Sequence, residues 1–139
     1  MHVIDELNNM SVTRTTKGTL PNVPFVRIKN AILGKKYTLS LVFPNRAVAK
    51  QLHKQWKKKN TPANILSFPL DTHEGEIFIS LEMARREAKK YQHLYIEHLT
   101  YLFIHGCAHL AGHTHGHDME KFEERFRKKF MTTTDEEYW

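Results

Sequence analysis

The chain has 139 residues, of which 40% are hydrophobic and 26% charged, and its net charge is +6. This balance is typical of one globular domain and excludes a largely disordered chain. A single cysteine excludes an internal disulfide, and no apolar run approaches membrane-spanning length. The N-terminus also lacks the pattern of a signal peptide. We therefore expect a cytoplasmic protein with no membrane contact.

In the first third of the chain, the patterns that predict secondary structure are weak in some segments and clear in others. Residues 1–23 are poorly defined: 3–4 indicate a short edge strand, and the Thr-rich stretch 11–19 indicates a loop. A short helix is predicted at 25–33. Alternating apolar residues then predict a strand at 37–43.

A second helix is predicted after Pro44, with Asn45 as its N-cap and its end near Lys58. Its apolar face is expected to carry Val48, Leu52 and Trp56. Two short strands follow, at 65–68 and 76–79, with a loop at 71–75 between them.

Three further helices complete the expected fold. Ser80 is a suitable N-cap for a helix that ends near Tyr91. The next helix, 96–111, is predicted to be largely buried by Leu94, Ile96, Leu99, Leu102, Phe103 and Ile104. The last is expected at 118–130, and 131–139 is a polar, poorly defined end. The elements do not alternate as regular βαβ units, so the expected class is α+β.

Residues 105–115 carry the pattern with the most chemical content. His105 and His109 are four residues apart and lie on one face of a helix. Gly112 is placed to end that helix in a left-handed turn, after which His115 folds back toward the first two. Three imidazoles with an open fourth position are typical of catalytic zinc, so we expect one Zn²⁺ per chain.

Other side chains in this stretch compete for the metal. His113 and His117 are alternatives to His115 as third ligand, but the spacing after Gly112 favours His115. Cys107 lies two residues from either helical ligand and points away from both by the helix period, so we interpret it as a packed thiol.

The spacing His-x3-His-x2-Gly-x2-His occurs in metzincin proteases, which carry a Glu base directly after the first His. Here that residue is Gly106, so a metallopeptidase lacks its base. The motif His-Gly-x-x-His-Leu-x-Gly-x-x-His instead resembles that of the YbeY family of bacterial metal-dependent endoribonucleases, which mature ribosomal RNA. The stretches 64–69 (Asn-Ile-Leu-Ser-Phe-Pro) and 75–77 (Gly-Glu-Ile) resemble the family's upstream motifs, in the same order.

This resemblance covers roughly residues 37–130 and implies a small mixed sheet covered by helices, with a metal-binding cleft. The chain departs from the family pattern at Lys57, Asn64 and Thr114, where the family usually has Arg, Asp and Asp.

The function implied is metal-dependent cleavage of single-stranded RNA in ribosomal RNA maturation and ribosome quality control. His105, His109 and His115 are the expected metal ligands, and Lys57, His105 and His109 the expected catalytic residues. Asp118, His113 and His117 remain open as general base. A metallopeptidase and a non-enzymatic ribosome-binding factor with a structural zinc are the alternatives.

The basic residues are clustered, which favours RNA, ribosomal RNA or the small ribosomal subunit as partner. One group surrounds the end of the second predicted helix, and it contains Lys54, Lys57, Lys58 and Lys59. Trp56 lies among these cations. An aromatic ring beside cations can stack a base while the cations contact phosphates.

Overall fold

The structure is a computed structural model that describes residues 2–17, 20–57, 64–113 and 116–131. Within these ranges the strands are β1 (His2–Asp5), β2 (Met10–Arg14), β3 (Thr38–Phe43), β4 (Ile65–Asp71) and β5 (Glu74–Ile79). The helices are α1 (Phe25–Leu33), α2 (Arg46–Lys57), α3 (Leu81–Lys90), α4 (Tyr95–Leu110) and α5 (His117–Met131), with a short 3-10 turn, η1 (Glu6–Asn8).

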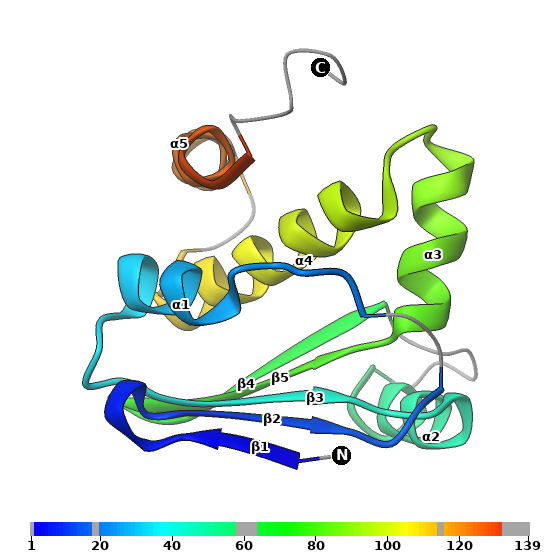
Figure 1. The fold of residues 1–139 in the computed structure, drawn as a ribbon, viewed down its shortest axis with the longest axis horizontal. Coiled ribbons are helices and arrows are strands. Elements are labelled where there is room, and N and C mark those ends of the chain that lie inside the picture. The colour runs from blue at the N-terminus through cyan, green and yellow to red at the C-terminus, as the bar shows by residue number, and fades with distance from the viewer. Residues whose placement is uncertain (1, 18–19, 58–63, 114–115, 132–139) are drawn as a thin grey trace.

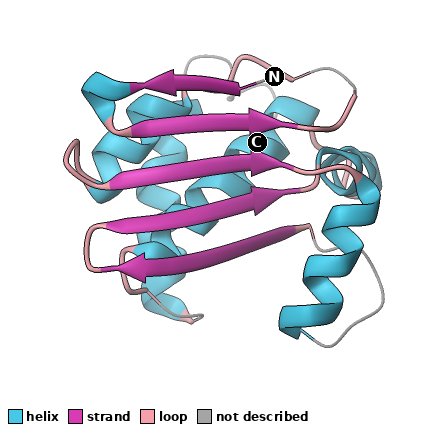
Figure 2. Cartoon of the chain, turned by 90° about the horizontal axis from the view of Figure 1, so that it is seen from below, coloured by secondary structure: helices cyan, strands magenta, loops and turns pink. Residues whose placement is uncertain are grey.

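The described strands form one mixed sheet in the order β1-β2-β3-β5-β4. β2, β3 and β5 run parallel, whereas the edge strands β1 and β4 are antiparallel to their neighbours (Figure 2). Figure 1 shows α1 and α4 over one face of the sheet, α5 stacked beyond them and α3 at one end. The predicted α+β class, with a small mixed sheet covered by helices, is confirmed.

Helix α4 is the centre of the helical layer and packs against β4, β5, α1, α3 and α5. It begins where the backbone N–H of Leu94 donates to Glu97 Oε1 at 3.2 Å. It ends in a left-handed turn at Gly112, whose φ is +97°. There the N–H groups of Gly112 and His113 donate to the carbonyls of His109 and Ala108, a Schellman arrangement.

The burial of α4 differs in part from the prediction. Leu99, Phe103 and Ile104 are completely buried, as expected. Leu94 and Ile96, in contrast, are 42% and 39% exposed, although Glu97 and His98 in the same first turn are buried. The core of α4 also contains polar side chains that apolar periodicity does not mark, namely Glu97, His98 and Thr100.

Two buried polar groups belong to the core beneath α4. The Cys107 thiol is fully buried, and burial raises its pKa, so it stays protonated at neutral pH as the predicted packed thiol. The Lys29 ammonium is also fully buried and donates to the carbonyls of Asn8 at 2.6 Å and Lys35 at 3.1 Å. It thereby ties η1 and the segment before β3 to α1.

Two loop predictions were wrong. Met10–Arg14, which falls in part within the predicted loop 11–19, is strand β2 and pairs with β1 and β3. Likewise β4 continues to Asp71 and β5 begins at Glu74, so the predicted loop 71–75 is a tight hairpin turn. In both places the hydrogen bonds come from strands distant in sequence or from hairpin pairing, which side-chain polarity does not reveal.

Helix α2 is capped as predicted, because the Val48 N–H donates to Asn45 Oδ1 at 3.0 Å. Its predicted apolar face is only partly covered. Ala49 is buried, whereas Val48 is 40% and Trp56 58% exposed. None of the described helices combines the length and the apolar character needed to cross a bilayer.

Candidate functional site

A cleft of about 680 Å³ lies between α4 and the edge strand β4. Its floor and walls come from both elements and from the end of α2. The lining residues are Trp56, Asn64, Ile65, Leu66, Ser67, Phe68, Pro69, Tyr101, Leu102, His105, His109 and Leu110. The cleft therefore brings together the predicted histidine pair and the predicted Leu-Ser-Phe-Pro stretch, which are about forty residues apart in the chain.

His105 and His109 face each other across one turn of α4. Their Nε2 atoms are 3.2 Å apart and their rings are nearly perpendicular, at 86°. On its other side His105 Nδ1 lies 2.6 Å from Glu123 Oε1 of α5. Because an ionised carboxylate only accepts, Nδ1 is the donor of this contact, and in the corresponding tautomer Nε2 carries the lone pair and faces His109.

This geometry fits a zinc ion. Two imidazole nitrogens that bind one tetrahedral zinc at about 2.0–2.1 Å lie about 3.3–3.4 Å apart. The measured separation of the two Nε2 atoms, 3.2 Å, is close to that value. A carboxylate on the distal nitrogen of a metal-binding histidine is also the usual way to fix its tautomer and orientation.

The predicted third ligand lies outside the described residues, as does Thr114. Within the described residues, no three His, Cys, Asp or Glu side chains converge as a complete metal site would. His113 stacks on Phe122, with ring centroids 4.0 Å apart. His117 and Asp118 are exposed at the start of α5 and are not among the described lining residues of the cleft.

Lys57, the other predicted catalytic residue, is the last residue of α2, and its side chain lies outside what the structure describes. Its neighbour Trp56 lines the cleft. The backbone of α2 therefore ends at the cleft.

Two residues of the site were missed in the sequence. Glu123 is only 5% exposed and lies between Met119 and Phe126 on the buried face of α5. A carboxylate in that apolar stripe was the signal that a partner had to exist. Tyr101 is four residues before His105 and lines the same cleft, with its ring 6.0 Å from that of His105. Burial, with the nearby Glu123 carboxylate as a further cause, raises the pKa of Tyr101.

Gly106 occupies the position where a metzincin carries its base, and it faces the sheet. A Cβ atom there would lie 2.9 Å from Ile65 Cδ1, 3.0 Å from Ile77 Cδ1 and 3.1 Å from Ser67 Oγ. Ser67 Oγ also donates to the Gly106 carbonyl at 3.4 Å. The close approach of α4 to β4 and β5 leaves no room for a glutamate side chain directed at the metal position.

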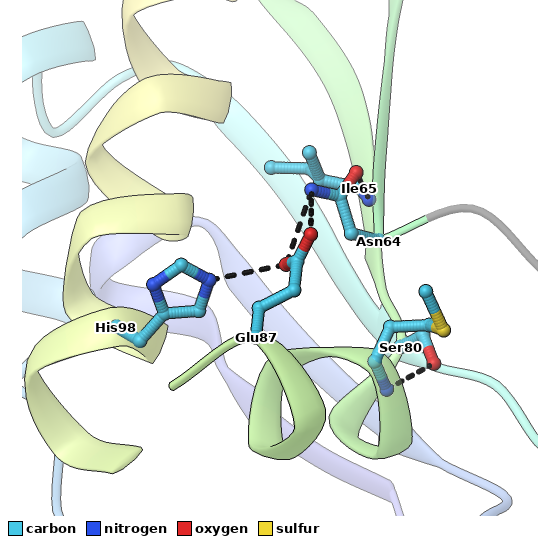
Figure 3. A network of polar contacts seen from close by, with 6 residues as sticks. Asn64, Ile65, Ser80, Glu87 and His98 are labelled. Atoms are coloured by element: carbon cyan, nitrogen blue, oxygen red, sulfur yellow. Dashed lines mark hydrogen bonds and ion pairs between the residues drawn. The ribbon is translucent and has the colours of Figure 1, made fainter. Parts of the chain in front are cut away.

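Asn64, directly before β4, lines the cleft and also belongs to a second polar network (Figure 3). Its amide nitrogen is 3.2 and 3.3 Å from the two carboxylate oxygens of Glu87, and its Oδ1 accepts from the Ile65 N–H at 2.7 Å. His98 Nε2 lies 3.1 Å from the same Glu87 carboxylate. An amide at position 64 can donate to Glu87, which a carboxylate at this position can do only when protonated.

Comparison with solved structures first identifies the class of fold. The chain superposes with a TM-score of 0.67 on the solution structure of a Thermotoga maritima protein, at 20% sequence identity and 93% coverage of both chains. At this level of identity the likeness concerns the fold alone.

Sequence comparisons identify the family. The model of the family described as endoribonuclease YbeY matches residues 5–135. Endoribonuclease YbeY of Prochlorococcus marinus (strain AS9601) is 35% identical over 122 residues, which cover 78% of this chain and 67% of the relative. That of Colwellia psychrerythraea is 34% identical over 94 residues, covering 63% and 61%. The chain thus spans about three fifths to two thirds of these relatives' length, and it belongs to the endoribonuclease YbeY family.

Proposed function

We propose that the chain is a zinc-dependent endoribonuclease that cleaves single-stranded RNA and acts in the cytoplasm on ribosomal RNA, in ribosome maturation and quality control. The family relatives that match it are named endoribonucleases. The observation that carries the metal-dependent part is the facing Nε2 pair of His105 and His109, 3.2 Å apart, with Glu123 behind His105.

The residues of the cleft have distinct tasks in this proposal. Glu123 holds His105 in the tautomer that directs its Nε2 lone pair at the metal position, and His115 completes the ligand set. His105, His109 and His115 would hold the zinc ion, which would supply Lewis acidity and an activated water at neutral pH. Tyr101, whose pKa is raised, stays protonated and donates a hydrogen bond to a phosphate oxygen in the cleft.

Lys57 is proposed to neutralise the charge that develops on the phosphate in the transition state. A lysine does this as a point charge, without the two-pronged contact of an arginine. Asp118, His113 and His117, which follow the metal motif in the chain, stay open as candidates for the general base, and none of the three is among the described residues that line the cleft.

The metallopeptidase alternative is disfavoured by the packing of Gly106, because the glutamate base of that class does not fit there. A non-enzymatic ribosome-binding factor with a structural zinc would bind RNA without cutting it. The metallopeptidase and the non-enzymatic factor thus both differ from the proposed endoribonuclease in a single measurable property, the cleavage of RNA.

The test is cleavage of an end-labelled, unstructured RNA of thirty nucleotides and of the same RNA annealed to its complement. We expect cleavage of the single strand, loss of cleavage with EDTA and recovery with added zinc. A variant with His105→Ala and His109→Ala should be inactive, while His73→Ala, in the exposed β4–β5 turn, should match the parent. RNA that is bound but left intact would favour the non-enzymatic factor, and cleavage of casein without cleavage of RNA would favour the peptidase.

A further inference from the structure

Trp56 is exposed where apolar periodicity predicts burial. Its side chain is 58% exposed at the end of α2, although Ala49, seven residues earlier on the same face of the helix, is only 3% exposed. A large aromatic ring left in water forgoes the stabilisation that burial would give. The exposed ring is not at a random surface position, since it lines the cleft that contains His105 and His109.

The Trp56 ring also packs against aromatic rings of the sheet. Its centroid is 5.1 Å from that of Phe68 of β4, at an interplanar angle of 53°. Phe68 in turn packs edge-on against Phe78 of β5, with centroids 5.7 Å apart and an angle of 74°. This row of three rings anchors Trp56 to the sheet, so that the exposed ring has a defined position at the cleft.

The helix that presents Trp56 is suited to a polyanion. Its sequence contains four basic residues and no acidic one: Arg46, Lys50, Lys54 and Lys57. Lys50 and Lys54 are exposed, and Arg46 is 3.5 Å from Glu82 of α3. A partner that combines flat apolar rings with regularly spaced negative charge is single-stranded nucleic acid.

We propose that Trp56 is a stacking platform for one unpaired nucleobase of the RNA, whose adjoining phosphodiester lies at His105 and His109. This inference rests on the proposed function and adds the determinant of single-strand selectivity. A base in a duplex is stacked and paired, and it reaches the ring only at the cost of being flipped out. The nucleotide beside the cut is therefore recognised by its ring face, with little preference for which base it is.

The first test is an abasic scan of an RNA that is cut at one place, with each nucleotide near the cut replaced in turn by an abasic one. Removing one particular base should lower kcat/KM for the parent about tenfold to a hundredfold, as expected for one lost base–aromatic stack. Trp56→Ala should lower cleavage of the intact RNA similarly and should be insensitive to the abasic site at that position. Trp56→Phe, which keeps a ring, should recover most of the rate, with zinc content equal in all variants.

Leu70→Ala is the matched control, because Leu70 is 53% exposed on the neighbouring stretch of β4 but does not line this cleft. It should keep both the parent's rate and the abasic penalty. An unchanged rate in Trp56→Ala, or an equal abasic penalty in parent and Trp56→Ala, overturns the inference while RNA cleavage by the parent still stands.

The second test does not depend on cleavage. In a Trp139→Phe background Trp56 is the remaining tryptophan, and stopped-flow mixing with a ten-nucleotide oligoadenylate should quench its fluorescence. The same oligomer in a duplex should give little quenching. If the parent cut no RNA, the proposed function would fail, but quenching by the single strand would still support the platform and its absence would overturn it. A parent that sediments as a dimer, with Trp56→Ala a monomer, would assign the ring to a second copy and also overturn it.

Discussion

Helix α4 carries two histidine–glutamate pairs two turns apart, and they use opposite nitrogens of the imidazole. His98 points Nε2 at Glu87 of α3, at 3.1 Å, and its Nδ1 is buried with no hydrogen-bond partner among the described residues. His105 points Nδ1 at Glu123 of α5, at 2.6 Å, and its Nε2 faces His109 at 3.2 Å.

The ring nitrogen that contacts the carboxylate decides which nitrogen is left to contact another group. In His98 the carboxylate of α3 occupies the tip of the ring, so the pair is a link between two helices. In His105 the carboxylate of α5 occupies the nitrogen near the backbone, so the tip is directed into the cleft. Two chemically identical pairs on one helix therefore differ in role through the direction from which the glutamate arrives.

The largest effect is expected from removing the cleft histidines. The double variant His105→Ala, His109→Ala should reduce bound zinc from about one ion per chain to near none, and RNA cleavage by at least about a thousandfold, because two of three ligands are lost. Elemental analysis and the RNA assay measure both. His98→Ala should keep its zinc. Full zinc occupancy in the double variant would show that His105 and His109 do not bind the metal, so the contrast between the His105 and His98 pairs would be lost.

Replacing the carboxylate behind His105 should weaken the metal site without abolishing it. Glu123→Gln is expected to raise the zinc dissociation constant about tenfold to a hundredfold, since a neutral amide orients and polarises the imidazole less well. Competition with a chromophoric chelator measures this constant. Glu87→Gln should leave it at the parent's value, and an equal loss in both variants would show that the two pairs do not differ in role.

The same exchange at Glu87 should instead affect stability. Glu87→Gln places an amide group among the donors Asn64 and His98 and should lower the free energy of unfolding by about 1–3 kcal/mol. Urea unfolding at constant zinc tests it. The control is Glu82→Gln on the same helix, whose ion pairs with Arg46 and Arg86 are more exposed and should contribute less than about 1 kcal/mol. Identical midpoints for all three proteins would contradict a linking role.

Substitutions of Lys57 test whether a positive charge that belongs to neither histidine–glutamate pair acts on the substrate. Lys57→Ala should lower RNA cleavage about tenfold, since a charge-assisted hydrogen bond contributes roughly 1.5 kcal/mol or more. Zinc content and thermal stability should stay at the parent's values. The slope of RNA affinity against salt should become shallower by up to about one. Lys57→Arg should keep or raise the rate. If Lys57→Ala and Lys58→Ala both cleave like the parent, Lys57 is an ordinary surface lysine.

The smallest effect concerns Lys29, a buried charge that has carbonyl partners in place of a carboxylate. Burial lowers the pKa of Lys29 below its ordinary 10.5, and the nearby Asp5 carboxylate opposes the shift. Between the lowered value and 10.5 the unfolded chain binds more protons than the folded one, so this group makes stability rise with pH in that window. Urea unfolding at pH 8, 9 and 10 should show the parent gaining stability relative to Lys29→Met. Parallel pH curves for the two proteins would contradict the lowered pKa.

Features that depend on neighbours within a few residues were determined by the sequence alone. Asn45 and Ser80 accept hydrogen bonds from Val48 and Met83, each three residues on, and Gly112 ends α4 at φ +97°. The facing of His105 and His109 is equally local, since four residues make one helical turn. For the same reason the sequence bounds α1 correctly at 25–33.

Features that depend on contacts between distant segments were decided by the tertiary structure. Strand β2 obtains its hydrogen bonds from β1 and β3, so its polar side chains did not reveal it. Glu123 reaches His105 only because α5 folds back along α4, eighteen residues later in the chain. Trp56 fits an apolar helical stripe, and only the placement of α2 beside β4 leaves it exposed in the cleft. Periodicity identifies which side chains share a face, but burial and partnership depend on what the fold places against that face.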